Sequence, residues 1–154
     1  MAEWIEPVID RTSADVERLI TLLEIGWEHM TTEERYEFSK DIKGALNRSD
    51  LERIKNNVTV IGDLLLLELI NPNIPEIPTY TYYRELLQDI TMIRNTHFYR
   101  QDTPQVPTGQ LNTYDKWNDI EKILLDAYEL ILLTITSYSY TGQELYAGDI
   151  IPVL

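Results

Sequence analysis

The sequence contains two histidines, His29 and His97, as its candidates for proton transfer or zinc binding. A general base or a zinc ligand needs a ring nitrogen that can reach a proton or a metal ion. His97 continues the apolar face of a helical pattern, which favours a packed, hydrogen-bonded core residue over a ligand. His29 lies close to Trp27 at the expected end of a helix, where capping or exposure explains it better. Neither histidine predicts an active site.

Glu6, Asp15 and Thr21 reproduce the spacing of the catalytic set of phage-type lysozymes. Those enzymes resemble one another in placing the aspartate in a glycine-bearing β-hairpin, because the two carboxylates face each other across a sugar cleft. Asp15 instead falls in the first turn of an expected helix, where a carboxylate binds free amides and the positive helix end. We therefore predict that this chain is not an enzyme.

No cofactor or metal site is predicted. The chain has no cysteine, which excludes disulfides, thiolate metal sites and cysteine nucleophiles within it. Its six glycines never approach the spacing of a phosphate-binding loop. The acidic segment 41–52 lacks the oxygen spacing and central glycine of a calcium-binding loop, so we interpret its carboxylates as solvated surface groups.

The formal charge of the chain is −13, from 13 Lys and Arg against 26 Asp and Glu. Phosphate backbones and anionic membranes repel such a surface, so we expect neither nucleic acid nor a membrane as partner. The most apolar runs, 58–70 and 123–135, are shorter than a membrane span and carry acidic residues. The N-terminus lacks the basic and then apolar character of a signal peptide, so general secretion is not expected.

Helices are expected to position these side chains, because apolar residues recur at steps of three and four along most of the chain. Capping boxes are expected from Thr12 with Asp15 and from Ser49 with Glu52. The expected elements are a helix at 13–27, a short helix from Thr31 or Thr32 toward Gly44, and longer helices at 50–71, 81–99 and 113–138.

We predict an all-α fold: a bundle of about four helices at 13–138, preceded by an extended arm at 1–12 and followed by a short β-hairpin-like tail at 139–154. A proline-rich linker at 71–79 and a loop at 100–112 interrupt the bundle. Four apolar helix faces are expected to build the core: Val16, Ile20, Leu23 and Trp27; Leu51, Ile54, Val58, Ile61 and Leu65; Leu86, Ile90, Ile93 and His97; and Trp117, Ile120, Leu124, Ala127 and Ile131.

Two stretches, 64–67 and 130–135, are apolar all the way round the helix. Such turns need cover on every side, and one small bundle encloses one central helix but hardly two. We therefore expect a homo-oligomer, with a trimer as first guess; the alternative is a monomer in which these turns are the most central. The candidates for a protein interface are Trp4, Leu64, Leu66, Leu67, Leu130, Leu132, Leu133, Ile135, Tyr138, Tyr140, Tyr146, Ile150 and Ile151.

Ten tyrosines are many for this length, and they cluster at 80–83 and 138–140. Tyrosine offers a broad contact surface and a hydroxyl at low entropic cost, which suits the binding of sugar or protein. Packing at helix ends is the interpretation that we favour over carbohydrate recognition.

Three segments carry a family resemblance: the opening 4–16 with its Asp10-Arg11-Thr12 run, the asparagine-rich helix start 44–57, and the tyrosine-glycine-acid ending 144–149. They resemble small virion proteins encoded in the tail-module regions of phages and prophages of Gram-positive bacteria. The resemblance implies a non-catalytic structural protein of the baseplate, tail tip or tail fibre. Such a protein is made in the host cytoplasm, assembles with other phage tail proteins and resides in the virion.

Two other functions are kept as alternatives. An acidic DNA mimic would occupy a host nucleic-acid-binding protein through carboxylates placed like phosphates. Basic residues interrupt the acids where they are densest and argue against mimicry, namely Lys40, Lys43, Arg48, Arg53 and Lys55. A host-surface attachment protein would bind carbohydrate through the tyrosine clusters.

Overall fold

The computed structural model describes residues 2–97 and 99–140, with the backbone alone at 138–140. Within these residues the chain is all-α, as the sequence predicts. The elements are α1 (Ser13–Ile25), the single 3-10 turn η1 (Trp27–His29), α2 (Thr32–Ser39), α3 (Arg48–Leu65), α4 (Tyr80–Thr96) and α5 (Tyr114–Tyr140). None of the described helices is both long and apolar enough to cross a membrane.

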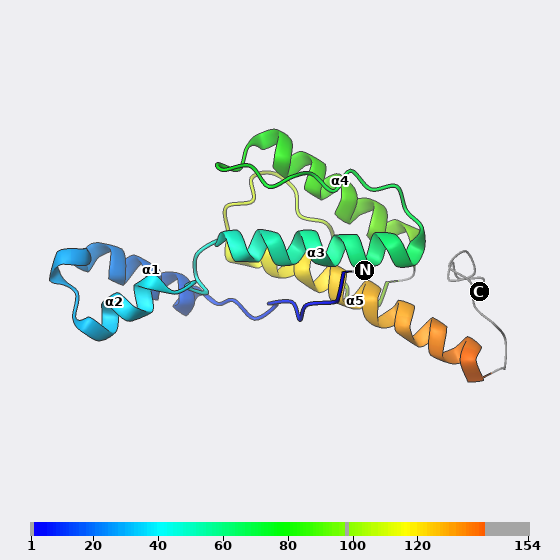
Figure 1. The fold of residues 1–154 in the computed structure, drawn as a ribbon, viewed down its shortest axis with the longest axis horizontal. Helices are drawn as coiled ribbons and strands as arrows, with labels where there is room; N and C mark the ends of the chain where they lie inside the picture. Colours follow the sequence, from blue (N-terminus) through cyan, green and yellow to red (C-terminus); the bar gives the residue numbers. More distant parts are fainter. Residues whose placement is uncertain (1, 98, 141–154) are drawn as a thin grey trace.

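The helices α3, α4 and α5 pack together into a three-helix core and run in the same direction (Figure 1). Parallel neighbours need long connections, and each connection returns beside the helices as extended chain. Segment 66–79 runs back along α3: Lys55 binds the carbonyls of residues 71 and 72, and Arg48, at the start of α3, binds those of residues 74 and 75. Segment 99–113 returns along α5 in the same way.

The hydrophobic core lies between these three helices. The apolar faces that the sequence predicts for α3, α4 and α5 are confirmed, because every member of them is buried. Several side chains are fully enclosed, among them Ile54, Ile61, Ile90, Ile120, Leu124 and Ile131. Burying one such side chain stabilises the fold by about 1.5–3 kcal/mol. The three-helix core is therefore the stable body of the molecule.

The extended segments have no strand partner among the described residues, so helix side chains bind their backbones. Asp89, which is buried on α4, accepts the amides of Ile70 and Asn71 at 2.9 and 2.7 Å. Arg94 donates to the carbonyl of Pro104 at 2.9 Å. Buried backbone groups need such partners to offset the water they lose. Several polar side chains of the core helices are buried for this reason.

The helices α1 and α2 form a lobe beside the N-terminal ends of the core helices (Figure 1). Between residues 13 and 43, Leu22 and Met30 are the buried side chains, so the lobe has little core of its own. Gly44 joins the lobe to the core. A Cβ atom at this position would lie 2.1 Å from the carbonyl oxygen of Asp15, so the close approach of the two backbones requires glycine.

The predicted buried stripe of the first helix is wrong. Ile20, Leu23 and Trp27 expose 47, 57 and 51% of their surfaces, and Val16 is half-buried. Instead, the buried side of α1 within the lobe is the one that carries Leu22. Apolar residues occupy a wide arc of this helix, and periodicity alone does not decide which edge of the arc faces inward.

The capping boxes of α1 and α3 differ in how well the sequence predicts them. Thr12 caps α1 together with Asp15, as predicted. The predicted box of Ser49 with Glu52 is wrong, because Asn47 and Asp50 form the box at the start of α3. Ser49 donates its hydroxyl to Asp41 instead. Both boxes fit the local spacing rule, and the fold of the preceding loop selects between them.

The helix α3 ends at Leu65 and not at residue 71 as predicted. Leu66 has a left-handed backbone, with φ of 53°, and the amide of Leu67 donates to the carbonyl of Gly62 at 2.9 Å. This cap reverses the chain into its return along α3. The reversal is a tertiary requirement, since 64–67 has the composition of a continuing helix.

A single bundle of about four helices is not confirmed, because three helices form the core and two more form the lobe. The N-terminal arm is extended, as predicted. The helix α5 continues to Tyr140, two residues beyond its predicted end. The remainder of the predicted β-hairpin-like tail lies outside the described residues.

Candidate protein-interaction site

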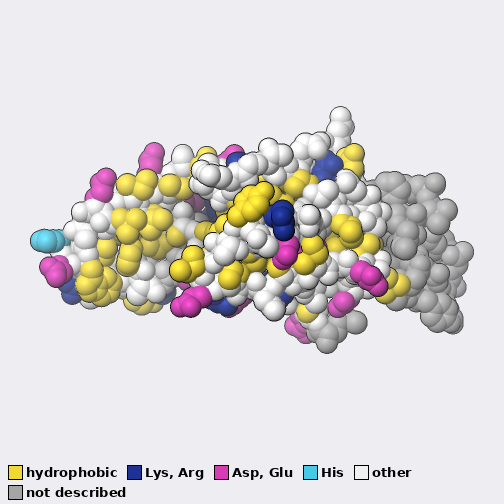
Figure 2. All heavy atoms as spheres, turned by 90° about the horizontal axis from the view of Figure 1, so that it is seen from above, with side chains coloured by type: hydrophobic (Ala, Val, Ile, Leu, Met, Phe, Trp, Pro, Cys, Tyr) yellow, Lys and Arg dark blue, Asp and Glu magenta, His cyan; other side chains and the backbone are white. Residues whose placement is uncertain are grey.

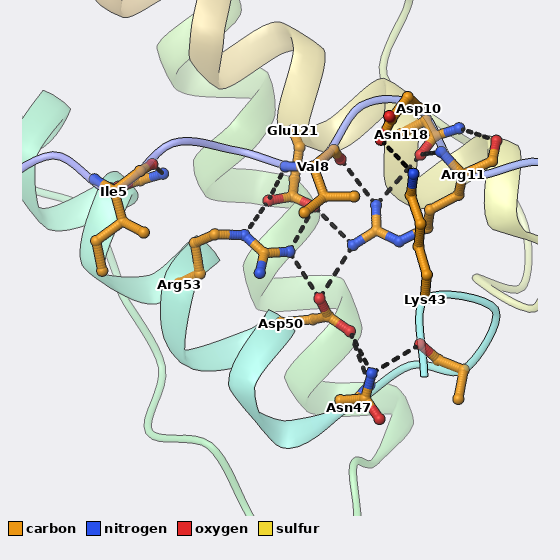
Figure 3. A network of polar contacts seen from close by, with 12 residues as sticks. Ile5, Val8, Asp10, Arg11, Lys43, Asn47, Asp50, Arg53, Asn118 and Glu121 are labelled. Atoms are coloured by element: carbon orange, nitrogen blue, oxygen red, sulfur yellow. Dashed lines mark hydrogen bonds and ion pairs between the residues drawn. The ribbon is translucent and has the colours of Figure 1, made fainter. Parts of the chain in front are cut away.

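Four charged side chains meet between the arm, α3 and α5, and we call them the ion-pair network (Figure 3). The guanidinium of Arg11 lies 2.7 Å from Glu121 and 3.2 Å from Asp50. Arg53 lies 2.6 Å from Glu121 and 2.7 Å from Asp50. Burial lowers the pKa of Arg53, but its hydrogen bonds to the two carboxylates raise that pKa above the ordinary value. Two cations thus neutralise two anions away from water.

Two asparagines bind the backbone of the arm on either side of the network. Asn57 accepts the amide of Ile5 at 3.0 Å and donates to its carbonyl at 2.7 Å. Asn118 accepts the amide of Arg11 at 3.2 Å and donates to its carbonyl at 2.9 Å. Each asparagine therefore pairs with one residue of the arm as a neighbouring strand would. Together they hold the arm against α3 and α5, and α1 begins directly after it.

The ion-pair network is absent from the predictions made from the sequence. The prediction that the carboxylates of 41–52 are solvated is wrong for Asp50, because Asp50 is buried. A signal was present: Asp50 and Asn57 share the predicted buried face of α3 with Ile54, at steps of four and three. A polar residue on a buried face needs a partner. Periodicity cannot identify that partner when it is as distant in sequence as Glu121.

The predicted interface residues fall into three groups. Leu66, Leu132 and Leu133 are exposed, by 55, 43 and 56%. The half-buried members are Trp4, Leu64, Leu67, Leu130 and Ile135. The others cannot be placed: Tyr138 and Tyr140 lie on the last turn of α5, where the side chains are not described, and Tyr146, Ile150 and Ile151 lie outside the described residues.

Trp4 differs from the other candidates because its own chain covers it. Its ring stacks on Tyr128 of α5, with the ring centroids 4.0 Å apart and an interplanar angle of 27°. Leu132 and Leu133 follow on the same helix, and the last part of α5 extends beyond the ends of α3 and α4 (Figure 1). The exposed leucines of α5 are therefore better placed than Trp4 to contact another chain.

A groove of about 1290 Å³ lies between α4 and the two return segments. Its wall is largely apolar, with Leu87, Met92, Val106, Pro107 and Leu111. Polar groups at its margin are Arg84, Gln88, Gln110 and Asn112. The groove is a concave surface that has room for a ligand.

The tyrosine cluster 80–83 is divided between core and surface. Tyr82 is buried, and burial raises its pKa to about 12. Tyr83 packs edge-on between the rings of Tyr82 and Trp117, at centroid distances of 5.6 and 5.9 Å, and it also lines the groove. Tyr80 is exposed. Tyr82 therefore packs in the core at the start of α4.

His97 is buried at the end of α4, as the sequence predicts. Burial lowers the pKa of its imidazole, and a hydrogen bond with the backbone of Leu130 partly offsets that shift. The unfolded chain therefore binds a proton more readily than the folded one. The stability due to the neutral ring is present above the ordinary histidine pKa and is lost as the pH falls toward the lower folded-state pKa.

Replacing His97 by leucine should make the free energy of unfolding less sensitive to acid. Urea titrations at pH 7 and at pH 5.5 measure this, and the loss between the two pH values should be smaller in His97→Leu than in the wild type. His29→Gln is the control, because it removes the other histidine of the sequence, which is exposed. Equal acid losses in the wild type and His97→Leu would contradict the prediction.

Asp15, the aspartate of the lysozyme-like spacing, has a structural role in the fold. Asp15 accepts the backbone amide of Thr12 at 2.9 Å, as predicted for a helix cap. Glu6 is exposed on the arm. Among residues 2–97 and 99–140, no group of three or more His, Asp or Glu side chains is placed to hold a metal ion.

Comparison with known proteins found no matching family model, no matching curated protein and no matching solved structure. A functional assignment therefore rests on the surfaces and charges of the chain itself. Among the described residues, surfaces that offer contact to another molecule include the exposed leucines of α5, the groove beside α4 and the apolar side of α1.

Proposed function

We propose that this chain is a non-catalytic structural protein of a phage tail, which acts by assembling with other protein chains. One observation carries the proposal: large apolar side chains stay exposed along helix faces of the folded single chain. Leu132 and Leu133 of α5 are the main example, because 43 and 56% of their surfaces are exposed. Large apolar side chains that stay exposed on a helix are candidates for contact with another chain. The end of α5 thus offers a helical face to copies of the same chain.

The place in a phage tail is supported by the resemblance of segments 4–16 and 44–57 to small tail-module virion proteins. These two segments are distant in sequence but adjacent in the fold, because Arg11 of the first binds Asp50 of the second. The resemblance thus covers residues that build one structural unit. A baseplate, tail-tip or fibre-associated position suits such a part, since these substructures are rings or spikes of repeated chains.

Changing Leu132 and Leu133 together to serine tests this function. The wild-type protein should sediment at micromolar concentration as a multiple of 18.0 kDa, with the trimer as first expectation, and the double variant as a monomer. Both side chains are exposed in the single chain, so the change should leave the fold intact. In phage particles that carry the double variant, mass spectrometry of purified tails should find the protein depleted.

Ile77→Ser is the matched control, because Ile77 is also exposed but lies on the return segment 66–79. This variant should keep the wild-type mass and its place in the tail. A wild-type protein that stays monomeric at every concentration would contradict self-association. Tails that lack the wild-type protein would contradict the proposed role.

A further inference from the structure

The helix α1 and the turn after it carry an apolar stripe that the described chain leaves uncovered. Ile20, Leu23 and Trp27 follow one another at steps of three and four, and about half of each side chain is exposed. We call these three residues the α1 stripe. Figure 2 shows hydrophobic side chains gathered over this lobe, with carboxylates at its edges. Ile20 and Leu23 lie on α1, and Trp27 follows in η1 after Gly26. Exposed apolar side chains on a helix are the feature through which it packs on another helix.

Within the α1 stripe, the ring of Trp27 is held in place although about half of the side chain is exposed. The ring of Trp27 lies 6.4 Å from that of Phe38, and the guanidinium of Arg35 lies 5.3 Å above its centroid. Arg35 also donates to the backbone carbonyl of Trp27 at 3.0 Å. A partner would therefore meet an ordered surface and lose little conformational entropy on binding it.

Carboxylates border the α1 stripe. Glu17 precedes Ile20 by three residues and Glu24 follows it by four, so both lie beside Ile20 on the helix surface. Both glutamates are exposed, and within the described residues neither carboxylate forms an ion pair or a hydrogen bond. The border of the stripe thus presents negative charge that is still available to a partner.

The basic residues of the lobe are already engaged within the chain. Arg18 binds Glu37 at 2.7 Å, and Lys40 lies 4.2 Å from the ring centroid of Tyr36. Residues 13–43 contain eight Asp and Glu against four Lys and Arg. The lobe therefore has an excess of acid around its apolar surface, which favours a partner of positive charge.

We infer that the α1 stripe binds an amphipathic helix of another protein chain, whose apolar face is bordered by lysine or arginine. The inference rests on the proposed assembly role and names the partner chemistry at a second surface of the molecule. A second copy of α1 fits less well. In a two-fold pairing the same border residues meet, so Glu17 and Glu24 of the two copies would repel each other.

The test uses the full-length protein and a synthetic helical peptide of leucine and lysine with an apolar face, with a leucine-glutamate peptide as its control. Methyl NMR spectra of the protein report where the peptide binds. The leucine-lysine peptide should shift the methyl resonances of Ile20 and Leu23 and leave those of Leu132 and Leu133 unchanged. The leucine-glutamate peptide should shift none of them.

Two variants separate the apolar from the charged part of the site. Ile20→Ser with Leu23→Ser should weaken peptide binding at least about tenfold. Glu17→Gln with Glu24→Gln should weaken it about threefold and flatten its dependence on salt, while the fold of the lobe stays the same. The Leu132→Ser, Leu133→Ser variant should bind the peptide as the wild type does.

Binding that moves to α5, or that is equal for the two peptides, would overturn the inference. So would a lower oligomer mass in the Ile20→Ser, Leu23→Ser variant, because a second copy would then occupy the stripe. If the peptide fails to bind while Leu132 and Leu133 still mediate self-association, the inference fails and the proposed function stands. If self-association fails as well, both fall.

Discussion

Replacing Glu121 by alanine is expected to destabilise the protein by about 3–5 kcal/mol, because the change leaves buried guanidiniums short of a counter-charge. The side chain of Glu121 is 1% exposed and binds both Arg11 and Arg53. After its removal, Asp50 alone faces the two cations. Urea titration measures the free energy of unfolding, and limited proteolysis of the arm should become faster, since Arg11 would lose its closest anchor on α5.

Glu129→Ala is the control for this experiment. Glu129 lies on the same helix and binds Arg100 at 2.6 Å, but its side chain is 43% exposed. Solvent screens such a pair, so the loss should stay below about 1 kcal/mol. Similar losses at Glu121 and Glu129 would contradict the role given to the ion-pair network.

Truncating Ile90 to alanine is expected to cost about 2–5 kcal/mol, because it removes buried methyl groups and leaves a cavity. Ile90 is fully enclosed in the centre of α4, among side chains of the three-helix core. The expected result is a lower urea midpoint with an unchanged slope, since the surface exposed on unfolding stays nearly the same.

The matched control is Ile20→Ala, the same substitution on the α1 stripe. Ile20 is about half exposed, so its truncation should change the free energy of unfolding by no more than about 0.5 kcal/mol. The sequence pattern places both isoleucines in the core, and this pair of variants distinguishes the pattern from the fold. A large loss at Ile20 would mean that the chain covers the stripe, and the inferred partner site would lose its basis.

The sequence predicts the long helices well because their signals are local. Steps of three and four mark the inner faces of α3, α4 and α5, and each predicted member, from Leu51 to Ile131, is buried. The cap of α1 by Thr12 and Asp15 is equally local. The all-α class and the long helices of the core thus follow from neighbouring residues alone.

The exposed candidates were predictable in part. The leucine-rich turns of 130–135 exceed what an amphipathic helix needs, and Leu132 and Leu133 are exposed in the described chain. Trp4 is also a large apolar residue, but Tyr128 of α5 covers its ring. Only the tertiary structure shows this contact. Residue type therefore identifies side chains that could contact another chain. Tertiary contacts decide which of these side chains remain exposed.

By itself, the sequence determined where most helices form and which faces of the core helices are apolar, since hydrogen bonds and side-chain spacing within a helix involve residues close in the chain. The tertiary structure alone decided the parallel order of α3, α4 and α5, the end of α3 at Leu65 and the exposure of Ile20. It also decided the burial of Asp50, whose partner Arg11 lies 39 residues away. Such contacts depend on how distant segments meet in space, and helical periodicity carries no information about that meeting.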